Sequence, residues 1–224
     1  TLTFTLSGLV NGDTTATAAG WVDPTCATTY ASTTTVAAGA SISCSAAAAS
    51  NYIFNYVSAS VTVTRAVVTV TANPYSITYA SAVPANSAYS ANVSGLKNSE
   101  TSAVFTSAIV CTSTYTQTTN VSDPAPTITC SGAAADNYSF SYTASTVTVS
   151  KATLTASLSA TSTYGSTTTN NSFVLTGFLN GQNEATFAGF VAPVCSFTSL
   201  AVNTAAGSYP TFAVNCTDGS STNY

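Results

Sequence analysis

The sequence predicts an all-β protein made of tandem, small antiparallel β-domains that follow one another end to end as a rod, with one disulfide per repeat. Three observations lead to this fold class. Apolar and aromatic residues alternate with Ser and Thr in short runs, a block of residues recurs at a fixed interval, and six cysteines fall two per block. Each unit would be an Ig-like sandwich or a β-grasp-like domain.

The repeat is clearest around an Asn-Tyr pair. Asn51–Tyr56 recurs as Asn137–Tyr142 and begins again at Asn223, and Arg65 and Lys151 stand 86 positions apart. This period predicts three domains: 1–64, which lacks its opening strand; 65–150, which is complete; and 151–224, which lacks its closing strands. We therefore expect the chain to be a segment of a longer array of repeats, or a neighbouring chain to supply the missing strands.

Each unit is expected to contain an alternating strand that ends at an Asn-Gly-type turn. The strand residues are Leu2, Phe4 and Leu6, then Tyr89, Ala91 and Val93, then Phe173 and Leu175; the turns are Asn11-Gly12, Asn98-Ser99 and Asn180-Gly181. A segment that tolerates a helical turn follows at 14–19, 101–105 and 183–188, with Asp13 or Ser99 near its start. An irregular crossover is the alternative.

The second half of each unit is expected to hold the remaining strands. A short strand ends at the second cysteine, in 40–44, 126–130 and 211–216. An aromatic strand follows, with Tyr52, Phe54 and Tyr56 or Tyr138, Phe140 and Tyr142 on one face, and the unit closes at 61–63 or 147–149. The next unit starts directly after Arg65 or Lys151, without a linker, at 68–71 or 154–157.

Composition excludes several classes of function. Only 4% of the 224 residues are charged, the net charge is −4, and there is no His or Met. Three cations, Arg65, Lys97 and Lys151, cannot form a basic patch, so nucleic acid is excluded as a partner. No run of about 20 apolar residues exists, so this segment contains no membrane span.

The cysteines predict an oxidising, extracellular compartment, because they are even in number and regularly spaced. Periodicity selects one pairing out of the possible ones: Cys26–Cys44, Cys111–Cys130 and Cys195–Cys216. Each disulfide would stabilise its unit by about 3 kcal/mol in the chain-entropy model. Zinc is the competing interpretation, and it lacks both His and closely spaced cysteine pairs.

The sequence offers no catalytic constellation, so we expect no enzyme, cofactor or metal site. Without His, neither a Ser-His-Asp triad nor a Cys-His pair can form. The carboxylates number seven: Asp13, Asp23, Glu100, Asp123, Asp136, Glu184 and Asp218. Asp13, Glu100 and Glu184 recur just after the turn, which fits turn chemistry better than catalysis or calcium binding. A Lys–Asn isopeptide bond at Lys97 is a weaker alternative.

The aromatic residues allow two interpretations. Tyr52, Phe54, Tyr56, their copies and Trp21 are expected in the core, although a carbohydrate-stacking platform would use the same residue types. Glycosylation is a further possibility, since Asn-x-Ser/Thr occurs at Asn92, Asn120, Asn137, Asn170 and Asn215, at a frequency close to chance.

These motifs together resemble a known family. Gly8–Thr14, Gly95–Thr101 and Gly177–Gly181, with the Asn-Tyr blocks that run through Ala66 and Ala152, are similar to the MBG repeats of large bacterial surface proteins. The Tyr164-Gly165 pair, and Tyr79-Ala80 before it, resemble the Tyr-Gly position of that family. The resemblance implies an all-β unit with a stalk or adhesive role and no catalytic residues. The cysteine pairs and the near absence of charge depart from the family.

The sequence therefore favours a structural role outside the cell. We expect a non-enzymatic segment of a bacterial cell-surface fibre, stalk or filament, whose partners are neighbouring repeats or copies of the same chain. The alternative is an adhesin that binds glycans or host proteins through exposed loops, among which the connections 27–43, 112–129 and 196–215 vary most between repeats.

Overall fold

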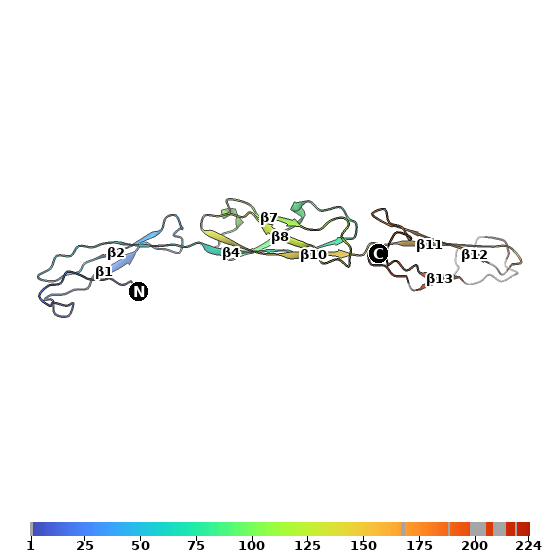
Figure 1. The fold of residues 1–224 in the computed structure, drawn as a ribbon. Helices are drawn as coiled ribbons and strands as arrows, with labels where there is room; N and C mark the ends of the chain where they lie inside the picture. Colours follow the sequence, from blue (N-terminus) through green and yellow to red (C-terminus); the bar gives the residue numbers. More distant parts are fainter. Residues whose placement is uncertain (1, 167–168, 188, 198–204, 208–213, 218) are drawn as a thin grey trace. The chain divides into compact units, whose positions relative to one another are not determined.

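The computed structural model describes residues 2–166, 169–187, 189–197, 205–207, 214–217 and 219–224. Within these residues, regular structure consists of β-strands and two 3-10 turns, η1 (Asn86–Ala88) and η2 (Ser102–Val104), so the all-β prediction is confirmed. The strands, labelled in part in Figure 1, are β1 (Thr25–Thr28), β2 (Ala40–Ser45), β3 (Ala59–Val61), β4 (Ala66–Ala72), β5 (Tyr75–Thr78), β6 (Ala91–Ser94), β7 (Val110–Ser113), β8 (Thr127–Ser131), β9 (Tyr138–Thr143), β10 (Ser145–Ser150), β11 (Thr155–Ser162), β12 (Thr169–Thr176), β13 (Val194–Phe197) and β14 (Val214–Thr217).

The chain divides into two compact units, each of which takes part of the second repeat. Unit 1 comprises Thr1–Thr71, Asn92–Val110 and Ser131–Thr143, and unit 2 comprises Ala72–Ala91, Cys111–Cys130 and Ala144–Tyr224. Unit 1 holds the sheets β1-β2-β3 and β6-β4-β9. Unit 2 holds the sheets β5-β10-β8-β7, β11-β12 and β13-β14. The domain borders at 64 and 150 stay a prediction from the period.

The second repeat contains two parallel strand pairs, so the expectation of purely antiparallel sheets was wrong. In unit 1, β4 runs parallel to β9, with Ala66 opposite Tyr138. In unit 2, β5 runs parallel to β10, with Tyr75 opposite Val147. A long crossover lies between the paired strands in sequence, and such a crossover lets the chain return in the same direction.

Each of the two sheets that the second repeat forms, β6-β4-β9 in unit 1 and β5-β10-β8-β7 in unit 2, has buried side chains of its own. Val68 and Val70 of β4 have no exposed surface, and neither does Ile128 of β8. Val147 of β10 is 1% exposed. Burying an aliphatic side chain of this size stabilises the fold by about 1.5–3 kcal/mol, so these side chains hold the central strands of the two sheets in place.

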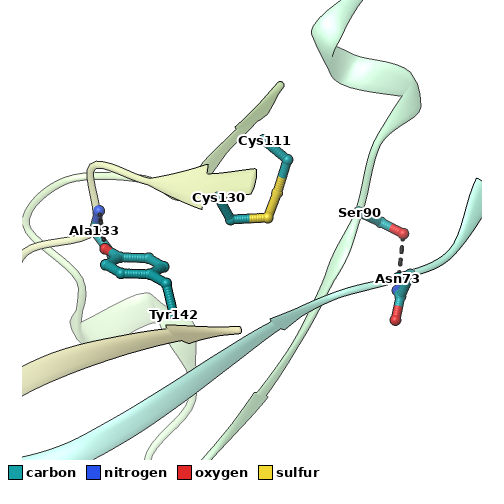
Figure 2. The surroundings of a disulfide bond; sticks show 6 residues. All are labelled: Asn73, Ser90, Cys111, Cys130, Ala133 and Tyr142. Carbon is teal, nitrogen blue, oxygen red and sulfur yellow. Dashed lines mark hydrogen bonds between the residues drawn. A yellow bond between two sulfur atoms is a disulfide. The ribbon is translucent and has the colours of Figure 1, made fainter. Parts of the chain in front are cut away.

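The structure joins the six cysteines in the same three pairs that the period selects. Cys26 lies directly opposite Cys44 on β1 and β2, and Cys195 lies opposite Cys216 on β13 and β14. Figure 2 shows the disulfide between Cys111 of β7 and Cys130 of β8. All three bridges therefore tie neighbouring strands together.

Two expected strands of the first repeat are not formed. Leu2–Leu6 lies outside regular structure, with Leu2, Phe4 and Leu6 each about two-fifths exposed, and 52–57 is likewise irregular. Their counterparts in the second repeat, β6 and β9, lie on either side of β4. A strand is held by backbone hydrogen bonds to a neighbour, and no strand equivalent to β4 flanks the first repeat among the described residues.

The segments that tolerate a helical turn contain no α-helix among the described residues. The segment 101–105 forms η2, and Thr101 caps it by accepting a hydrogen bond from the Ala103 N–H. The segments 14–19 and 183–187 form turns. There the Thr14 side chain accepts a hydrogen bond from the Ala16 N–H, and the Asn183 side chain accepts one from the Ala185 N–H. The capping residue is thus Thr14 rather than the expected Asp13, and Thr101 rather than the expected Ser99. The strand predicted at 211–216 lies outside the described residues as far as position 213.

Candidate functional site: the junctions between repeats

One asparagine forms the same contact at two repeat junctions. In unit 1 the Val36 N–H donates to Asn137 Oδ1 at 2.9 Å, and in unit 2 the Val121 N–H donates to Asn223 Oδ1 at 2.9 Å. Asn137 and Asn223 are copies of one position, and Val36 and Val121 lie in equivalent connections of the preceding repeats. Each junction thus has its own polar contact, made by a side-chain amide rather than by ions.

The second junction buries this asparagine almost completely. Asn223 is 1% exposed, and its Nδ2 donates to Asn120 Oδ1 at 2.6 Å. Its backbone carbonyl accepts a hydrogen bond from the Ala152 N–H at 2.9 Å, as the Asn137 carbonyl does from the Ala66 N–H at 3.0 Å. A buried amide with its hydrogen bonds satisfied fixes the position of the groups around it.

A second amide recurs at both junctions. Asn98 Nδ2 donates to the Ser32 carbonyl at 3.1 Å, and Asn180 Nδ2 donates to the Gln117 carbonyl at 3.1 Å. Asn98 and Asn180 both occupy a left-handed conformation, with φ of 52°, in the turn that the sequence predicts. Asn tolerates this conformation better than most residues, so the turn and the junction contact use the same side chain.

The tyrosine that follows each junction asparagine closes the turn. Tyr138 donates to Glu100 Oε2 at 2.5 Å and accepts from the Lys97 N–H at 2.9 Å. Tyr52 likewise donates to Asp13 Oδ2 at 2.7 Å. The hydrogen bond to the carboxylate of Glu100 raises the pKa of Tyr138, and the bond to Asp13 raises the pKa of Tyr52. These two carboxylates are therefore acceptors for tyrosine hydroxyls, which the sequence analysis missed.

In the third repeat a glutamine replaces that carboxylate. Tyr224 donates to Gln182 Oε1 at 2.6 Å and accepts from the Leu179 N–H at 2.9 Å. The structural counterpart of Asp13 and Glu100 is therefore Gln182, and the sequence-based alignment with Glu184 was wrong. Burial raises the pKa of Tyr224.

The second junction contains an additional tyrosine from the opening half of the second repeat. Tyr79 donates to Gln182 Oε1 at 3.2 Å and accepts from Asn180 Nδ2 at 3.3 Å. Its ring packs edge-on against Tyr224 at 5.6 Å between centroids, and the side chain is only 2% exposed. The Tyr79 N–H donates to the carbonyl of Ser150 at the end of β10, at 2.8 Å.

The first junction has a cavity of about 400 Å³ where the equivalent groups meet. Asn98, Glu100 and Tyr138, the counterparts of Asn180, Gln182 and Tyr224, line it. Lys97 and Asn137 line it too, together with residues of the connection 30–36 and with Val63, Thr64 and Ala66.

A cationic side chain bonds to the backbone just before the junction asparagine in the second and third repeats. Arg65 Nε donates to the Asp136 carbonyl at 3.0 Å, and Lys151 Nζ donates to the Ser221 carbonyl. Both cations lie on exposed residues. Because they bind backbone carbonyls close to the junction asparagine, they support the turn that presents it.

The predicted aromatic core is only partly correct. Tyr138 is buried, and Phe140 packs edge-on against Phe105 at 5.0 Å. Tyr56 and Tyr142, however, are 41% and 38% exposed, and their hydroxyls accept from the Ala47 and Ala133 N–H groups at 2.8 and 3.0 Å. Figure 2 shows the Tyr142–Ala133 bond. The last tyrosine of the aromatic run therefore fastens the alanine-rich turn.

Trp21 contacts one aromatic side chain and one carboxylate. Its ring packs edge-on against Phe54 at 5.6 Å, and its Nε1 donates to Asp23 Oδ1 at 2.8 Å. The ring thus has an apolar partner and its N–H a polar one, as is usual for tryptophan near a surface.

The remaining carboxylates do not gather into a site. Asp123 accepts from the Asn120 N–H at 2.7 Å in a local turn, and Asp218 lies outside the described residues. Over the part of the chain that the structure describes, no three His, Cys, Asp or Glu side chains are placed to hold a metal ion. No helix in that part has the length and apolar character needed to cross a bilayer.

Comparison with known proteins agrees with the motifs and the fold. The family model of the MBG domain (YGX type) matches residues 1–62 and 68–148, which is more than half of the chain. No curated protein and no solved structure matches the sequence. With its Asn-Tyr blocks, its Tyr-Ala and Tyr-Gly pairs and its all-β repeats, the chain belongs to the MBG domain family of the YGX type.

Proposed function

We propose that the chain is a non-enzymatic structural segment of an extracellular bacterial fibre, stalk or filament, in which the junctions hold successive repeats in a fixed relation. Membership of the MBG family supports an extracellular repeat module, and the three disulfides support an oxidising compartment. The filament and its stiffness are our proposal.

The recurrence of the junction contacts carries this proposal. The same two amides bond the same two backbone positions at both junctions. A flexible string of domains would need no such conserved geometry, because its linkers would absorb the motion. Here Ala66 and Ala152 enter the next repeat within two residues of Arg65 and Lys151, and each is hydrogen-bonded to a junction asparagine.

The chemistry of the junctions suits a structural role outside the cell. The recurring contacts of Asn137, Asn223, Asn98 and Asn180 join side-chain amides to backbone groups, which do not titrate between about pH 5 and 9 and are little screened by salt. A fibre that meets changing acidity and salinity would keep such contacts. Catalysis has no support in the site, since its polar groups all serve one another or the backbone.

The decisive experiment measures motion across a junction. Spin labels would be placed at two exposed residues on either side of the second junction, Thr148→Cys in β10 and Val174→Cys in β12 of the third repeat. We expect a narrow distance distribution, which broadens when Asn223→Ala removes the junction amide. A broad distribution in the otherwise unchanged chain would contradict the structural role.

A glycan screen on the same protein tests the adhesin alternative. Specific, saturable binding of one glycan class that is lost on changing the loop 112–129 would favour an adhesin. Absence of binding together with a narrow distance distribution would support the structural role.

A further inference from the structure

We propose that Asn180 and Gly181 form a spontaneous deamidation site, at which loss of the asparagine amide opens the second junction. This inference rests on the proposed function, because it concerns how long the junction contact lasts. The amide that makes the contact stands directly before a glycine, in an exposed turn. All the groups involved belong to unit 2.

The backbone of this turn leaves the glycine nitrogen accessible. Asn180 and Gly181 are both exposed and both left-handed, with φ of 52° and 70°. The hydrogen bond that closes the turn runs from the Gln182 N–H to the Leu179 carbonyl at 3.0 Å, so it does not use the Gly181 N–H. A Cβ placed on Gly181 would have nothing within 4 Å, so the space beside the peptide nitrogen is open to water.

These features are what deamidation through a cyclic imide requires. Hydroxide removes the proton of the Gly181 N–H, and the nitrogen attacks Cγ of Asn180. A C–N bond forms, the bond between Cγ and Nδ2 breaks, and Nδ2 leaves as ammonia after taking a proton from water, which restores the hydroxide. Water then opens the ring at either carbonyl and gives an aspartate or an isoaspartate. Glycine favours the attack because its backbone is flexible and no side chain blocks its nitrogen.

The reaction removes the donor on which the junction depends. Asn180 Nδ2 donates to the Gln117 carbonyl at 3.1 Å and to the Tyr79 hydroxyl at 3.3 Å. A carboxylate has no donor and would place a negative charge beside the Gln117 carbonyl oxygen. An isoaspartate also adds a methylene group to the backbone of the turn that carries Gln182, whose side chain accepts from Tyr79 and Tyr224. Either product therefore breaks contacts of the second junction.

The first junction supplies a matched comparison within the same chain. Asn98 and Ser99 occupy the same left-handed turn, with φ of 52° and 60°, and Asn98 Nδ2 donates to the Ser32 carbonyl at 3.1 Å. The two turns differ in the residue whose nitrogen must attack, which is serine at the first junction and glycine at the second. Because the serine side chain crowds that nitrogen, the first junction should lose its amide several times more slowly than the second.

Mass spectrometry of the folded chain, kept in mildly alkaline buffer, tests the reaction. Trypsin cleaves after the three cations, so Asn98 and Asn180 fall in different peptides. We expect Asn180 to be converted to a carboxylate several times faster than Asn98. Both rates should rise with pH, because hydroxide starts the reaction.

The distance between spin labels at Thr148→Cys and Val174→Cys reports what deamidation does to the junction. We expect the distance distribution to broaden in step with the carboxylate formed at Asn180. Asn180→Asp, which carries one of the two products from the start, should show the broad distribution at once.

Exchange of the residue after the asparagine separates the reaction from the fold. Gly181→Ser should slow deamidation at Asn180 and keep the distribution narrow for longer, and the site has room for the added side chain. Ser99 already occupies the equivalent left-handed position, so this variant copies a turn that the chain itself contains. Ser99→Gly should speed the reaction at Asn98 and leave the second junction unchanged.

Two results would overturn the proposal: an Asn180 amide that is lost no faster than that of Asn98, or a distribution that stays narrow although Asn180 has been converted. A distribution that is broad before any ammonia is lost would contradict the structural function. The rates in the tryptic peptides would still decide whether Asn180 is a deamidation site, so the two proposals can fail separately.

Discussion

At the scale of single residues, the asparagine of the Asn-Tyr pair is buried to a different extent in each repeat. Asn51, Asn137 and Asn223 are copies, but Asn51 is exposed, Asn137 is partly buried and Asn223 is 1% exposed. The difference follows from what lies beside them: Val36 and Val121 in preceding repeats for the second and third copies.

We expect Asn223→Ala to lower the free energy of unfolding by about 1–3 kcal/mol, because it leaves the N–H of the half-buried Val121 and the side-chain amide of Asn120 without their partner. Asn51→Ala should change it by less than about 0.5 kcal/mol, as for other surface positions. Urea unfolding of the two variants side by side measures the difference. Equal losses in the two variants would mean that the hydrogen bonds of Asn223 at the junction do not contribute to the free energy of unfolding.

Tyrosine ionisation gives a pH dependence with a definite sign. The pKa of Tyr138 is raised by its bond to Glu100, and that of Tyr224 by burial, so the folded chain holds these protons more tightly than the unfolded chain. The resulting stability is fully present below the ordinary tyrosine pKa of 10.0 and is lost as pH rises through the raised values.

Thermal melts between pH 8 and 12 should therefore show a constant midpoint at first and then a fall above about pH 10. Tyr138→Phe should reduce the steepness of that fall, since one of the responsible groups is removed. A variant with an unchanged slope would assign the alkaline transition to other residues.

At the scale of elements, the turn before the junction amide depends on close packing against β4. Gly95 ends β6 with φ of 97°, and a Cβ placed there would come within 2.6 Å of the Val67 carbonyl oxygen. Gly8 is its copy in the first repeat, with φ of 94° and nothing within 4 Å of the same Cβ position. The two glycines thus share a backbone conformation but not a neighbour.

Gly95→Ala should destabilise the chain by clearly more than Gly8→Ala. The Gly8 variant carries only the cost of a left-handed Ala, about 1–2 kcal/mol, and the Gly95 variant adds a backbone clash. Chemical denaturation of the two variants gives the comparison. Similar losses would show that β6 can move away from β4 at little cost.

The disulfides differ in their surroundings more than in their loop lengths. The pairs Cys26–Cys44 and Cys111–Cys130 close loops of 18 and 19 residues, but only the second pair is buried, at 5% and 6% exposure. Replacing either pair with alanines should cost about 3 kcal/mol through the unfolded state. The Cys111/Cys130 variant should lose more, because packing around β7 and β8 is lost too. Melting under non-reducing conditions measures both, and equal losses would show that packing adds nothing.

At the scale of the whole molecule, the small number of charged residues predicts that the free energy of unfolding depends little on salt concentration. Only 4% of residues are charged, and the recurring contacts of Asn137 and Asn223 join a side-chain amide to a backbone N–H. Raising sodium chloride from about 0.05 to 0.5 M should shift the free energy of unfolding by less than about 0.5 kcal/mol. A larger shift at neutral pH would reveal an electrostatic contribution that these contacts do not contain.

Much of the architecture could be predicted from the sequence because it depends on local patterns. Period-2 alternation identified β2, β8 and β10 close to their observed bounds, and the repeat gave the disulfide pairing that the structure contains. The recurring asparagine was visible too, although only as a landmark. Its function at the junction could not be predicted, because its partners Val36 and Val121 lie about 100 residues away in sequence.

By itself, the sequence determined that this is an all-β tandem repeat with few charges, many hydroxyl groups and regularly spaced cysteines. Only the tertiary structure decided that β4 and β5 pair in parallel with β9 and β10, and that 52–57, the copy of β9 in the first repeat, is irregular. It also decided that Tyr79 is buried and Tyr164 exposed, although both occupy the same repeat position. The physical reason is common to all three: a strand or a phenol is stabilised by the partner beside it, and the repeat pattern specifies the residue but not its neighbour.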